Sequence, residues 1–534
     1  MHPKKFIQSF TATQAILLIA LLAWYVFFLA KKIDIITADL GRHITNGRIL
    51  LQSGFSGAGN SVLSSNVYSY TNPDYPFLNH HWASGVIFFL VNRLAGFNGL
   101  SILFILVSVA TFLIFFRMAQ QRAGFSLSFA LALLFIPLIA DRVEIRPEVF
   151  SYFFIGLFFY ILRRWSAQES SGRSLYLLPF LTLFWVNIHI YFFFGFFLMG
   201  VFLLNEIISL SDHASRAAAR ARIKQLAIII LLMFLAVLCN PAGISGALYP
   251  LTIFKNYGYL IVENQSIWFL ERIGFVTSSF LLFKIALGIV AASFAGCIVL
   301  RRSACSFINA VLACALAAIS LVAIRNFALF GLFALPISAQ NIAAILPDHI
   351  RRDMEAFYSG FVFLLCIFAI GVVALVSPRI MQQYETLGIG LVPGVAQAAA
   401  FFLDHHLQGP VLNNYDIGGY LIYYLYPQER VFVDNRPEAY PNSFFTDIYV
   451  PLQENNEQWQ RANTRYRFNA IFFSHRDYTP WAQAFLIARI NDPEWAPVFA
   501  DQYAIIFLKR NSVNASIIQQ FEISKDHFGI TSTQ

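Results

Sequence analysis

Three residues near the start of the chain have side chains suited to acid–base and phosphate chemistry. In the stretch "ITADLGRHITNGRILLQSG", which begins at Ile36, Asp39, Arg42 and His43 are spaced three and four residues apart. On a helix, such residues share one face. A carboxylate there can accept a proton while a bond forms, and a guanidinium beside an imidazole can hold an anion such as a phosphate. The elements around this segment decide where that chemistry would take place.

The composition predicts that those elements are membrane spans. The chain has 534 residues, of which 58% are hydrophobic and only 12% are charged. Soluble domains carry roughly twice that share of charge, about 25%. The formal net charge is +8, but Lys and Arg cluster in short loops between apolar runs, as they do in cytoplasmic loops. There is no basic stripe interleaved with aromatic residues, which argues against nucleic acid as a partner.

Apolar runs of near-membrane length predict an α-helical polytopic membrane protein with about eleven spans, or thirteen if two have been merged. The predicted spans are 11–30, 98–116, 125–140, 148–163, 174–188, 190–209, 223–239, 276–300, 304–323, 326–346 and 356–376. The short run "WASGVIFFLVNRLAG" breaks the alternation of loop charge, so we expect an interfacial or re-entrant helix there. The first hydrophobic run has no A-x-A cleavage site and is interpreted as an uncleaved span with a cytoplasmic N-terminus.

Loop charge predicts which ends of the spans face outward. "RMAQQR", "RRWSAQESSGR", "HASRAAARARIK", "RRSAC" and "HIRRDM" are basic and are expected to be cytoplasmic. Either odd number of spans then places the C-terminal part outside. We therefore expect a transmembrane domain over 1–377, with a long first outer loop at 31–97, and a soluble α/β domain over 378–534 on the outer face. In that domain "FNAIFFSH" and "YAIIFLKR" are strand candidates, "WAQAFLIARIN" is a helix candidate, and "YDIGGYLIYYLY" lies in a stretch with strand-like pieces.

The polar residues of the predicted transmembrane domain gather at its outer ends. Ionisable groups beside a membrane are costly unless they are paired or wetted, so we infer a shared polar cavity. The residues are Asp39, Arg42, His43, His80, His81, Arg142, Glu144, Arg146, Glu148, Asn187, His189, Asn240, Glu263 and Arg325.

Each of these residues also has a purely structural interpretation. Asp39 could favour a helix N-terminus, and His189 could be hydrogen-bonded at the end of a span. "RVEIRPEVF" could be an ion-paired loop whose Pro147 starts the next helix, and "CNPAG" could be only a helix stop. The pair His80–His81 offers too few ligands for zinc. The gathering of all these residues on one side favours a functional site.

The order of the motifs resembles bacterial membrane glycosyltransferases of the GT-C fold, which are similar to protein O-mannosyltransferases and to the aminoarabinose transferase of lipid A. The resemblance rests on an acid, a His and a Gly on the first-loop helix, then "SYT", then an aromatic stretch that ends in Trp82. Further matches are "IRPE", "WVNIH", "NPAG", "YDIGGYLIY" and "VFVDNRPEAY", and they extend over nearly the whole chain. The matching residues are Asp39, His43, Gly47, Ser69, Tyr70, Thr71, Trp82, Arg146, Pro147, Trp185, Asn187, His189, Asn240, Pro241, Gly243, Gly418, Gly419, Asp434 and Arg436.

The resemblance implies transfer of a sugar from a polyprenyl-phosphate-linked donor to a glycan, lipid or protein acceptor, with inversion, at the outer face of the bacterial plasma membrane. Asp39 would be the base. Arg42, His43, Arg146, His189 and Arg325, in that order, would contact the phosphate, and a hydrophobic groove between spans would take the prenyl tail. Further substrate-binding candidates are His80, His81, Asn240 and Glu263.

This chain departs from the family pattern at two places. His81 stands where an acid is expected before Trp82, and Asp39 has no adjacent second acid. We therefore assign no cofactor and no metal ligands, although a divalent metal stays compatible with the family. Asp434 and Arg436 are expected to pair with each other rather than to act in catalysis.

Three other interpretations are compatible with the sequence. An O-antigen ligase or polymerase also handles lipid-linked sugars, but it would rely on Arg and His in a late loop. A transporter would show paired halves and ionisable groups near the bilayer centre, and neither is present. A membrane scaffold could keep the fold without catalysis, and it would tolerate the change of Asp39 to Asn.

Overall fold

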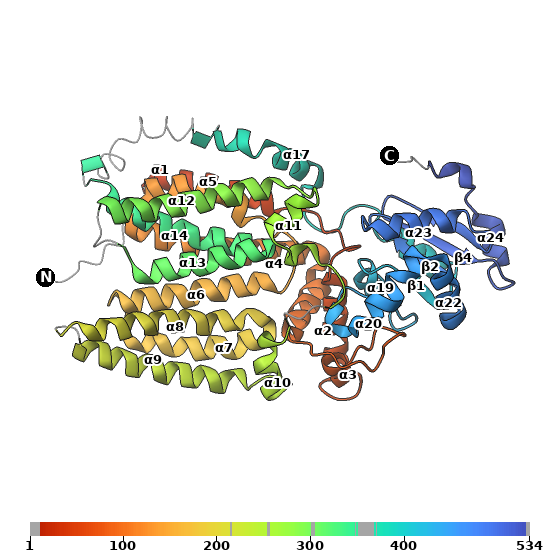
Figure 1. Ribbon diagram of the computed structural model, residues 1–534, viewed down its shortest axis with the longest axis horizontal. Coiled ribbons are helices and arrows are strands. Elements are labelled where there is room, and N and C mark those ends of the chain that lie inside the picture. Colours follow the sequence, from red (N-terminus) through yellow and green to blue (C-terminus); the bar gives the residue numbers. More distant parts are fainter. Residues whose placement is uncertain are drawn as a thin grey trace.

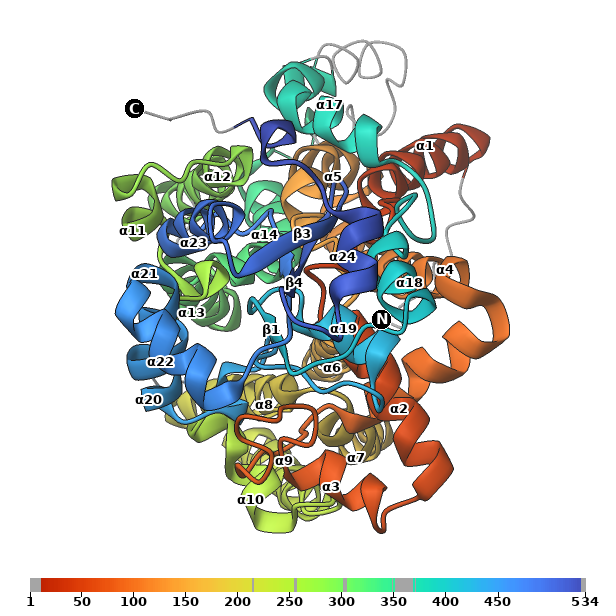
Figure 2. The same ribbon diagram turned by 90° about the vertical axis from the view of Figure 1, so that its right-hand side faces the viewer.

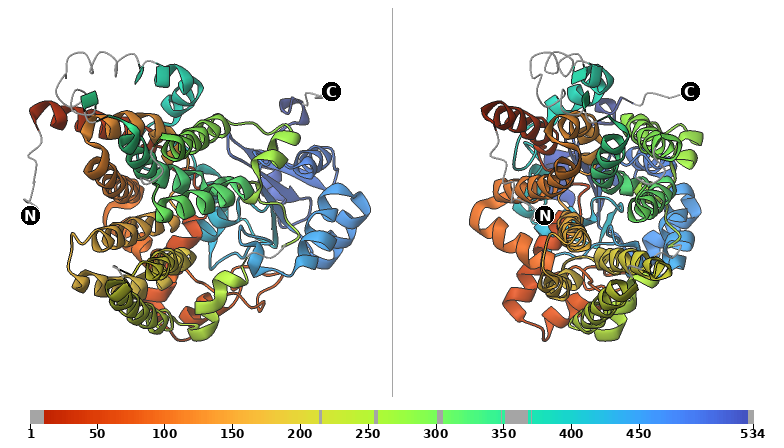
Figure 3. Two further views of the ribbon diagram at one scale, coloured as in Figure 1. Left: turned by 60° about the vertical axis from the view of Figure 1, so that its left-hand side comes forward. Right: turned by 90° about the vertical axis from the view of Figure 1, so that its left-hand side faces the viewer.

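The computed structural model describes residues 11–213, 216–253, 257–300, 305–347, 349–350, 368–369 and 371–529. A bundle of helices fills one end of the molecule and a smaller domain with a sheet caps the other end (Figure 1). Two further views show the same arrangement from other sides (Figure 3). Most of the predicted span 356–376 lies outside the described residues.

Helices coincide with the other ten predicted spans. Five of the described helical segments are long and apolar enough to cross a membrane: Ala12–Leu29, Trp82–Ala123, Ile190–Ser211, Ser278–Leu300 and Ile324–Ile345. Two shorter apolar helices are α5 and α13. The bundle consists of α1 (Ala12–Leu29), α4 (Trp82–Ala123), α5 (Phe125–Ile139), α6 (Glu148–Ser166), α7 (Leu177–Ile188), α8 (Phe193–Ile208), α9 (Arg216–Val237), α12 (Ser278–Leu300), α13 (Phe307–Val322) and α14 (Phe327–Ile345). The total of eleven to thirteen spans stays a prediction.

Helix α4 is broken where the sequence predicts the end of an interfacial segment. Ala95 and Gly96 have non-helical backbone angles, and the φ of Gly96 is +60°, a conformation that glycine adopts at little cost. The first part of α4 therefore runs in a different direction from the rest (Figure 2). This agrees with a separate short helix at "WASGVIFFLVNRLAG", and its position at the membrane interface stays a prediction.

The first loop contributes two helices that lie between the bundle and the C-terminal domain, α2 (Leu40–Ser53) and α3 (Ala58–Ser64). Helix α2 crosses the end of the bundle instead of continuing it (Figure 1). It is held by close backbone contacts at glycines: a Cβ atom on Gly47 would overlap the carbonyl oxygen of Gly85, and one on Gly41 would lie 2.7 Å from the carbonyl oxygen of Gly419. The glycines of "LGRHITNG" thus allow α2 to fit between α4 and α19 (Gly418–Leu425).

The C-terminal domain contains a four-stranded mixed sheet with the strand order β1-β2-β4-β3. Strand β1 is parallel to β2, and β4 is antiparallel to both β2 and β3. The strands are β1 (Val411–Asn413), β2 (Ala470–Ser474), β3 (Trp495–Ala500) and β4 (Ala504–Lys509). The remaining described α-helices are α10 (Gly243–Leu248), α11 (Ile267–Arg272), α17 (Ser377–Thr386), α18 (Gln397–Asp404), α19 (Gly418–Leu425), α20 (Asn442–Phe444), α21 (Pro451–Glu454), α22 (Asn456–Tyr466), α23 (Pro480–Ile490) and α24 (Ala515–Phe521).

The sheet separates two hydrophobic cores because successive strand residues point to opposite faces. Phe472 and Ile506 belong to the core that continues into the helical bundle, whereas Ile471 and Phe507 belong to a second core with Trp459. The strand candidates in "FNAIFFSH" and "YAIIFLKR" and the helix in "WAQAFLIARIN" are confirmed as β2, β4 and α23. The boundary at 377/378 stays a prediction, and α17 spans it.

The stretch that is predicted to have strand-like pieces contains strand β1, but its segment Gly418–Leu425, within "YDIGGYLIYYLY", forms helix α19. The reason is tertiary. A Cβ atom on Gly418 would overlap Cα of Asp434, and one on Gly419 would lie 2.9 Å from the carbonyl oxygen of Ala38. A helix that begins with two glycines can approach this closely both the segment at Asp434, which follows α19, and the residue Ala38 just before α2, although its aromatic and β-branched composition favours a strand.

Candidate functional site

Asp39 lies at the junction of the bundle and the C-terminal domain, between two arginines. Its Oδ1 is 3.7 Å from Nη2 of Arg42, and its Oδ2 is 3.8 Å from Nη1 of Arg146. Asp39 occupies the residue before α2, but its side chain makes no capping hydrogen bond. The position of Asp39 at the N-terminus of α2 agrees with the helix-terminus interpretation, and the shared face of Asp39 and Arg42 is confirmed.

A chain of ion pairs continues from Arg146 into the bundle. Glu263 accepts a hydrogen bond of 2.6 Å from Arg142 and one of 3.0 Å from Arg146, and it lies 3.9 Å from Arg325. Glu148 accepts from Arg142 at 2.6 Å and lies 3.7 Å from Arg325. The segment "DRVEIRPE" is thus an ion-paired loop, and it also connects Asp39 with Glu263 and Arg325.

Burial and the arginines have opposite effects on the acids of this chain. Burial raises the pKa of Asp39, and Arg146 and Arg42 offset only part of that effect. For Glu263, burial also favours the neutral form, but Arg142, Arg146 and Arg325 together hold the pKa well below its usual range. Glu263 is therefore a fixed anion, whereas Asp39 is the acid of this group that can take up a proton more readily.

Three imidazoles pack together, and one of them, that of His81, contacts Arg42. The ring of His81 is 4.6 Å from that of His43 and 4.3 Å from that of His80, and Nε2 of His81 is 3.4 Å from Nη1 of Arg42. Burial lowers the pKa of all three, that of His80 to about 3, and Arg42 adds to the effect. The imidazoles are therefore neutral at pH 7. The side-chain pair of Asp39 with His43, which their spacing allows, is not formed; His43 instead packs against His81 and Phe88.

Two predicted site residues have local structural partners. His189 shares a hydrogen bond of 2.8 Å between its Nδ1 and Oγ of Ser151. Asn240 donates to the carbonyl oxygens of Val237 and Gly243 and accepts from the backbone N–H of Ala242. Asn240 thus closes the turn after α9, as the helix-stop interpretation expects, and it is not in the Arg–Glu chain.

A hollow of about 480 Å³ lies between the first loop, the start of α4 and the ends of α7 and α9. This volume is within the range of small-molecule sites, about 300–1,000 Å³. Trp82 forms part of its wall and donates a hydrogen bond of 2.9 Å to Asn187. The lining residues are Phe55, Leu63, Trp82, Asn187, Cys239, Asn240 and Pro241. A second cavity, of about 20 Å³ beside Arg142 and Glu148, is the size of one water molecule.

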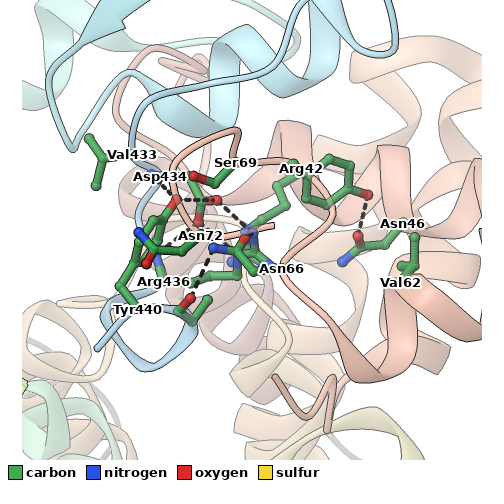
Figure 4. Close-up of polar contacts among 12 residues, drawn as sticks. Arg42, Asn46, Val62, Asn66, Ser69, Asn72, Val433, Asp434, Arg436 and Tyr440 are labelled. Atoms are coloured by element: carbon green, nitrogen blue, oxygen red, sulfur yellow. Dashed lines mark hydrogen bonds and ion pairs between the residues drawn. The ribbon is translucent and has the colours of Figure 1, made fainter. Parts of the chain in front are cut away.

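Asp434 and Arg436 pair with each other, as expected from the sequence. Arg436 donates to Oδ1 of Asp434 at 2.7 Å and to Oδ2 at 2.6 Å, and both residues are buried. Arg436 also donates to Oδ1 of Asn66 at 2.6 Å, and Asp434 accepts from Tyr440 at 3.2 Å (Figure 4). The pair therefore fastens the first loop to the C-terminal domain.

Sequence reasoning missed two acids of the C-terminal domain that are within electrostatic reach of Asp39. Asp416 precedes α19, and Glu438 follows the Asp434–Arg436 pair. The charge of Asp39 acts on both, and Glu438 is also within electrostatic reach of Arg42. Both lie in motifs that resemble the GT-C family, "YDIGGYLIY" and "NRPEAY". No local sequence pattern, however, indicates that these two acids face the first loop.

The described residues contain no group of three or more His, Cys, Asp or Glu side chains arranged to hold a metal ion. The residues present therefore do not assemble a ligand set, and we derive no step through a metal.

No family model matches the chain, and no curated protein matches it by sequence. Solved structures are similar over nearly its whole length. ArnT from Cupriavidus metallidurans in the apo state has a TM-score of 0.52 and 13% identity, with 93% of this chain and 98% of that chain covered. The oligosaccharyltransferase AglB from Archaeoglobus fulgidus, in complex with an inhibitory peptide and a dolichol-phosphate, has a TM-score of 0.54 and 12% identity, with coverage of 94% and 74%.

A further structure of the Archaeoglobus fulgidus oligosaccharyltransferase, in complex with zinc and sulfate, has a TM-score of 0.54 and 10% identity, with coverage of 92% and 73%. At these identities the likeness establishes the fold alone. The chain has the GT-C fold that its sequence motifs predict.

Proposed function

We propose that this chain is a membrane glycosyltransferase that moves a sugar from a polyprenyl-phosphate-linked donor to an envelope acceptor, with inversion. The observation that carries the proposal is the position of Asp39 between Arg42 and Arg146 at the junction of the bundle and the C-terminal domain. The shared fold supports it, since AglB is described with a dolichol-phosphate, a lipid phosphate of the same chemical class.

Asp39 is the proposed base. Its side chain makes no hydrogen bond with the described residues, and burial raises its pKa, so the carboxylate has free lone pairs and an increased proton affinity. In the transfer step the O–H or N–H bond of the acceptor breaks and its proton goes to Asp39. The acceptor atom bonds to the anomeric carbon from the side opposite the donor phosphate. The bond between that carbon and the phosphate oxygen breaks, and its electron pair leaves with the prenyl phosphate.

Arg42 is the strongest candidate for holding the phosphate. Its side chain is 3% exposed, and its Nε has no hydrogen-bond partner. Its neighbours His43, His80 and His81 are neutral, so Asp39 is the one described anion that forms an ion pair with it, at 3.7 Å. Cations stabilise the charge that grows on a leaving phosphate. The guanidiniums of Arg146 and Arg325 are nearby but are already paired with Glu263.

The charge of the predicted loops supports the cellular location. The basic loops of the sequence favour a plasma-membrane protein with a cytoplasmic N-terminus, and the C-terminal domain would then face the periplasm or the exterior. The site would lie where the phosphate of a lipid-linked donor meets the outer interface, and the prenyl tail would lie against the apolar helices.

Mass spectrometry of envelope glycans and prenyl-phosphate sugars tests the proposal in four strains: wild type, deletion, Asp39→Asn and Asp34→Asn. Asp34 is the matched control, because this acid of the same segment pairs with Arg476 instead of the site arginines. We expect the deletion and D39N strains to lose one sugar from one acceptor and to accumulate its lipid donor, while D34N resembles wild type. If the deletion changes neither the envelope glycans nor the prenyl-phosphate sugars, the proposed function is wrong. If the D39N strain has wild-type glycans, Asp39 is not the base.

A further inference from the structure

A short segment between α10 and α11 joins the C-terminal domain to the bundle. At its domain end, the ring centroid of Tyr259 lies 4.3 Å from that of Tyr415 and 5.3 Å from that of Phe445, and Tyr259 packs against the second hydrophobic core. We call residues 257–266 the strap, because its two ends are held by different parts of the molecule.

The other end of the strap is fixed to the bundle. The carbonyl oxygen of Gln265 accepts a hydrogen bond of 3.1 Å from the backbone N–H of Ile324, and Oδ1 of Asn264 accepts one of 2.9 Å from Arg325. Between the two ends, Glu263 pairs with the arginines of the Arg–Glu chain. The position of its carboxylate therefore depends on both attachments.

Glu263 and Asp39 compete for one guanidinium. Nη1 of Arg146 donates a hydrogen bond of 3.0 Å to Glu263, whereas Oδ2 of Asp39 lies 3.8 Å from the same nitrogen, beyond hydrogen-bond distance. Nε of Arg146 donates to Glu144 at 2.8 Å. The hydrogen bonds of this guanidinium are thus directed to the two glutamates, and Asp39 interacts with it only as a charge.

Of the two glutamates, Glu263 holds Arg146 more firmly. The side chain of Glu144 is 49% exposed, and solvent weakens the pairing of exposed charges. That of Glu263 is 21% exposed, and it also accepts a hydrogen bond of 2.6 Å from Arg142. Among the described residues, the acids within 4 Å of Arg146 other than Glu263 are the exposed Glu144 and Asp39. Loss of Glu263 would therefore leave Arg146 free to pair with Asp39.

Glu263 also affects how readily Asp39 takes up a proton. Burial raises the pKa of Asp39; among the neighbouring charges, that of Arg146 lowers it most, and that of Glu263 raises it. The loss of a negative charge and the release of a guanidinium would both lower the proton affinity of Asp39. The charged and titratable groups that interact electrostatically with Asp39 are Arg42, Arg146, Glu144, Glu263, Tyr415, Asp416 and Glu438.

We propose that Glu263 is a positioning residue: it holds Arg146 away from Asp39 and so keeps Asp39 a strong base, and the packing of Tyr259 on the C-terminal domain holds Glu263 in place. The proposal rests on the proposed transfer reaction, in which Asp39 accepts the proton of the acceptor. It adds a means of regulation, because a C-terminal domain that releases the strap would weaken the base. Glu263 acts through Arg146 and does not have to contact either substrate.

Chemical labelling of Asp39 tests the proposal without turnover. Purified full-length protein in detergent is treated with an apolar carbodiimide and glycine ethyl ester, which convert protonated carboxyls into amides. Peptide mass spectrometry then compares Asp39 with the exposed Asp447. On the alkaline side of the Asp39 titration, E263Q should lower the relative labelling of Asp39 by about tenfold, the lower end of the effect of one charge within about 4–6 Å of a carboxyl. Unchanged labelling in E263Q overturns the inference whether or not transfer occurs.

Two matched variants are the controls. E263D retains the charge and should label more like wild type than E263Q does. E271Q removes another acid of the same stretch of chain, which pairs with Lys284 at 2.6 Å, and should leave the labelling unchanged. In E263Q each of the three site arginines keeps a second acid within 4 Å, so the variant is expected to fold, and its Tm verifies this. An equal loss of labelling in E271Q and E263Q would contradict the proposal.

Transfer kinetics show whether Glu263 positions the base or binds a substrate. The acceptor probe is the envelope extract of the deletion strain, and the donor probe is its prenyl-phosphate sugar fraction. In E263Q the acidic limb of the pH–rate profile should move to lower pH. The maximal rate should fall by less than the loss of about 100-fold or more expected for D39N, while the half-saturating amounts of both probes stay unchanged.

The outcomes of the kinetic test are distinct. A raised half-saturating amount with an unmoved pH profile would make Glu263 a substrate-binding residue and overturn the proposal. If wild type transfers no sugar but the labelling of Asp39 responds to E263Q, the proposed function fails and the positioning role of Glu263 stands.

Variants of Tyr259 test the link to the C-terminal domain. Y259A removes the ring from its contacts and should lower the labelling of Asp39 as E263Q does, whereas Y259F keeps the ring and should label like wild type. If both changes act through Arg146, the double variant Y259A/E263Q should label no less than E263Q alone. Wild-type labelling in Y259A, or fully additive losses, would overturn the link between the C-terminal domain and Asp39.

Discussion

Replacing Arg436 by Met should destabilise the C-terminal domain and its contact with the first loop. Arg436 and Asp434 form a two-point ion pair with side chains that are 2% and 0% exposed. The guanidinium also donates to Asn66 and lies 4.6 Å over the ring of Phe77. R436M leaves the Asp434 carboxylate buried without its counter-charge, and breaking such a pair from one side costs about 3–5 kcal/mol.

That cost corresponds to a large change in thermal stability. In a unit of 150–250 residues, 1 kcal/mol shifts Tm by about 2–4 °C, so R436M should lower Tm by roughly 6–20 °C. Intrinsic fluorescence of the detergent-solubilised protein measures it, because Trp459 and Trp495 are buried in the core of the C-terminal domain.

Two comparisons make the result decisive. R461M breaks a pair with Glu457 whose side chains are 66% and 69% exposed, and it should cost at most about 0.5 kcal/mol. The double variant D434N/R436M removes both charges and should recover part of the loss. If R436M shifts Tm no more than R461M, the structural role assigned to the pair is wrong. Loss of transfer at unchanged Tm would instead indicate that the pair contributes to the chemistry.

Three further changes test the packing around the site. G47A should lower the free energy of unfolding by about 1–3 kcal/mol in a thermal unfolding assay, because the new methyl group meets the backbone of α4. The control G200A faces open space and should be neutral or stabilising. Burial lowers the pKa of His43, so between its folded and unfolded pKa values the unfolded chain binds more protons than the folded chain. The contribution of His43 to stability should be constant above about pH 6.5 and should fall on acidification by up to about 1.4 kcal/mol per pH unit, so H43Q should reduce the acid slope in Tm measurements. N187L removes the acceptor of the hydrogen bond from the Trp82 indole and should lower the free energy of unfolding by about 1–3 kcal/mol. Tryptophan fluorescence on heating measures the effect, and an unchanged Tm would contradict the assigned hydrogen bond.

The sequence alone predicted the helices and strands correctly where a pattern of neighbouring residues is enough to determine them. Long apolar runs fixed the positions of the helices from Ala12–Leu29 to Phe327–Ile345, since burial of a continuous apolar segment does not depend on distant partners. Short continuous apolar runs rich in aromatic and β-branched residues identified β2 and β4. The spacing of Asp39 and Arg42 correctly placed them on one helix face.

The local sequence pattern did not predict the secondary structure where a contact with a distant segment determines it. "YDIGGYLIYYLY" has a composition typical of strands, yet it is helical because Gly418 and Gly419 pack against backbone from two other segments. Strand β3, which contains Pro497, gave too weak a signal to be predicted, and it is completed by its pairing with β4.

The sequence by itself thus determined the class of protein, most helix positions and the set of polar residues from which a site could be made. Only the tertiary structure decided which of them meet. It separated Asn240 from the Arg–Glu chain, assigned His189 to Ser151, and packed Gly419 of the C-terminal domain against Ala38, the residue before Asp39. The physical reason is that helix and strand periodicity is set by near neighbours, whereas electrostatic and glycine-mediated contacts are set by how the packed elements cross.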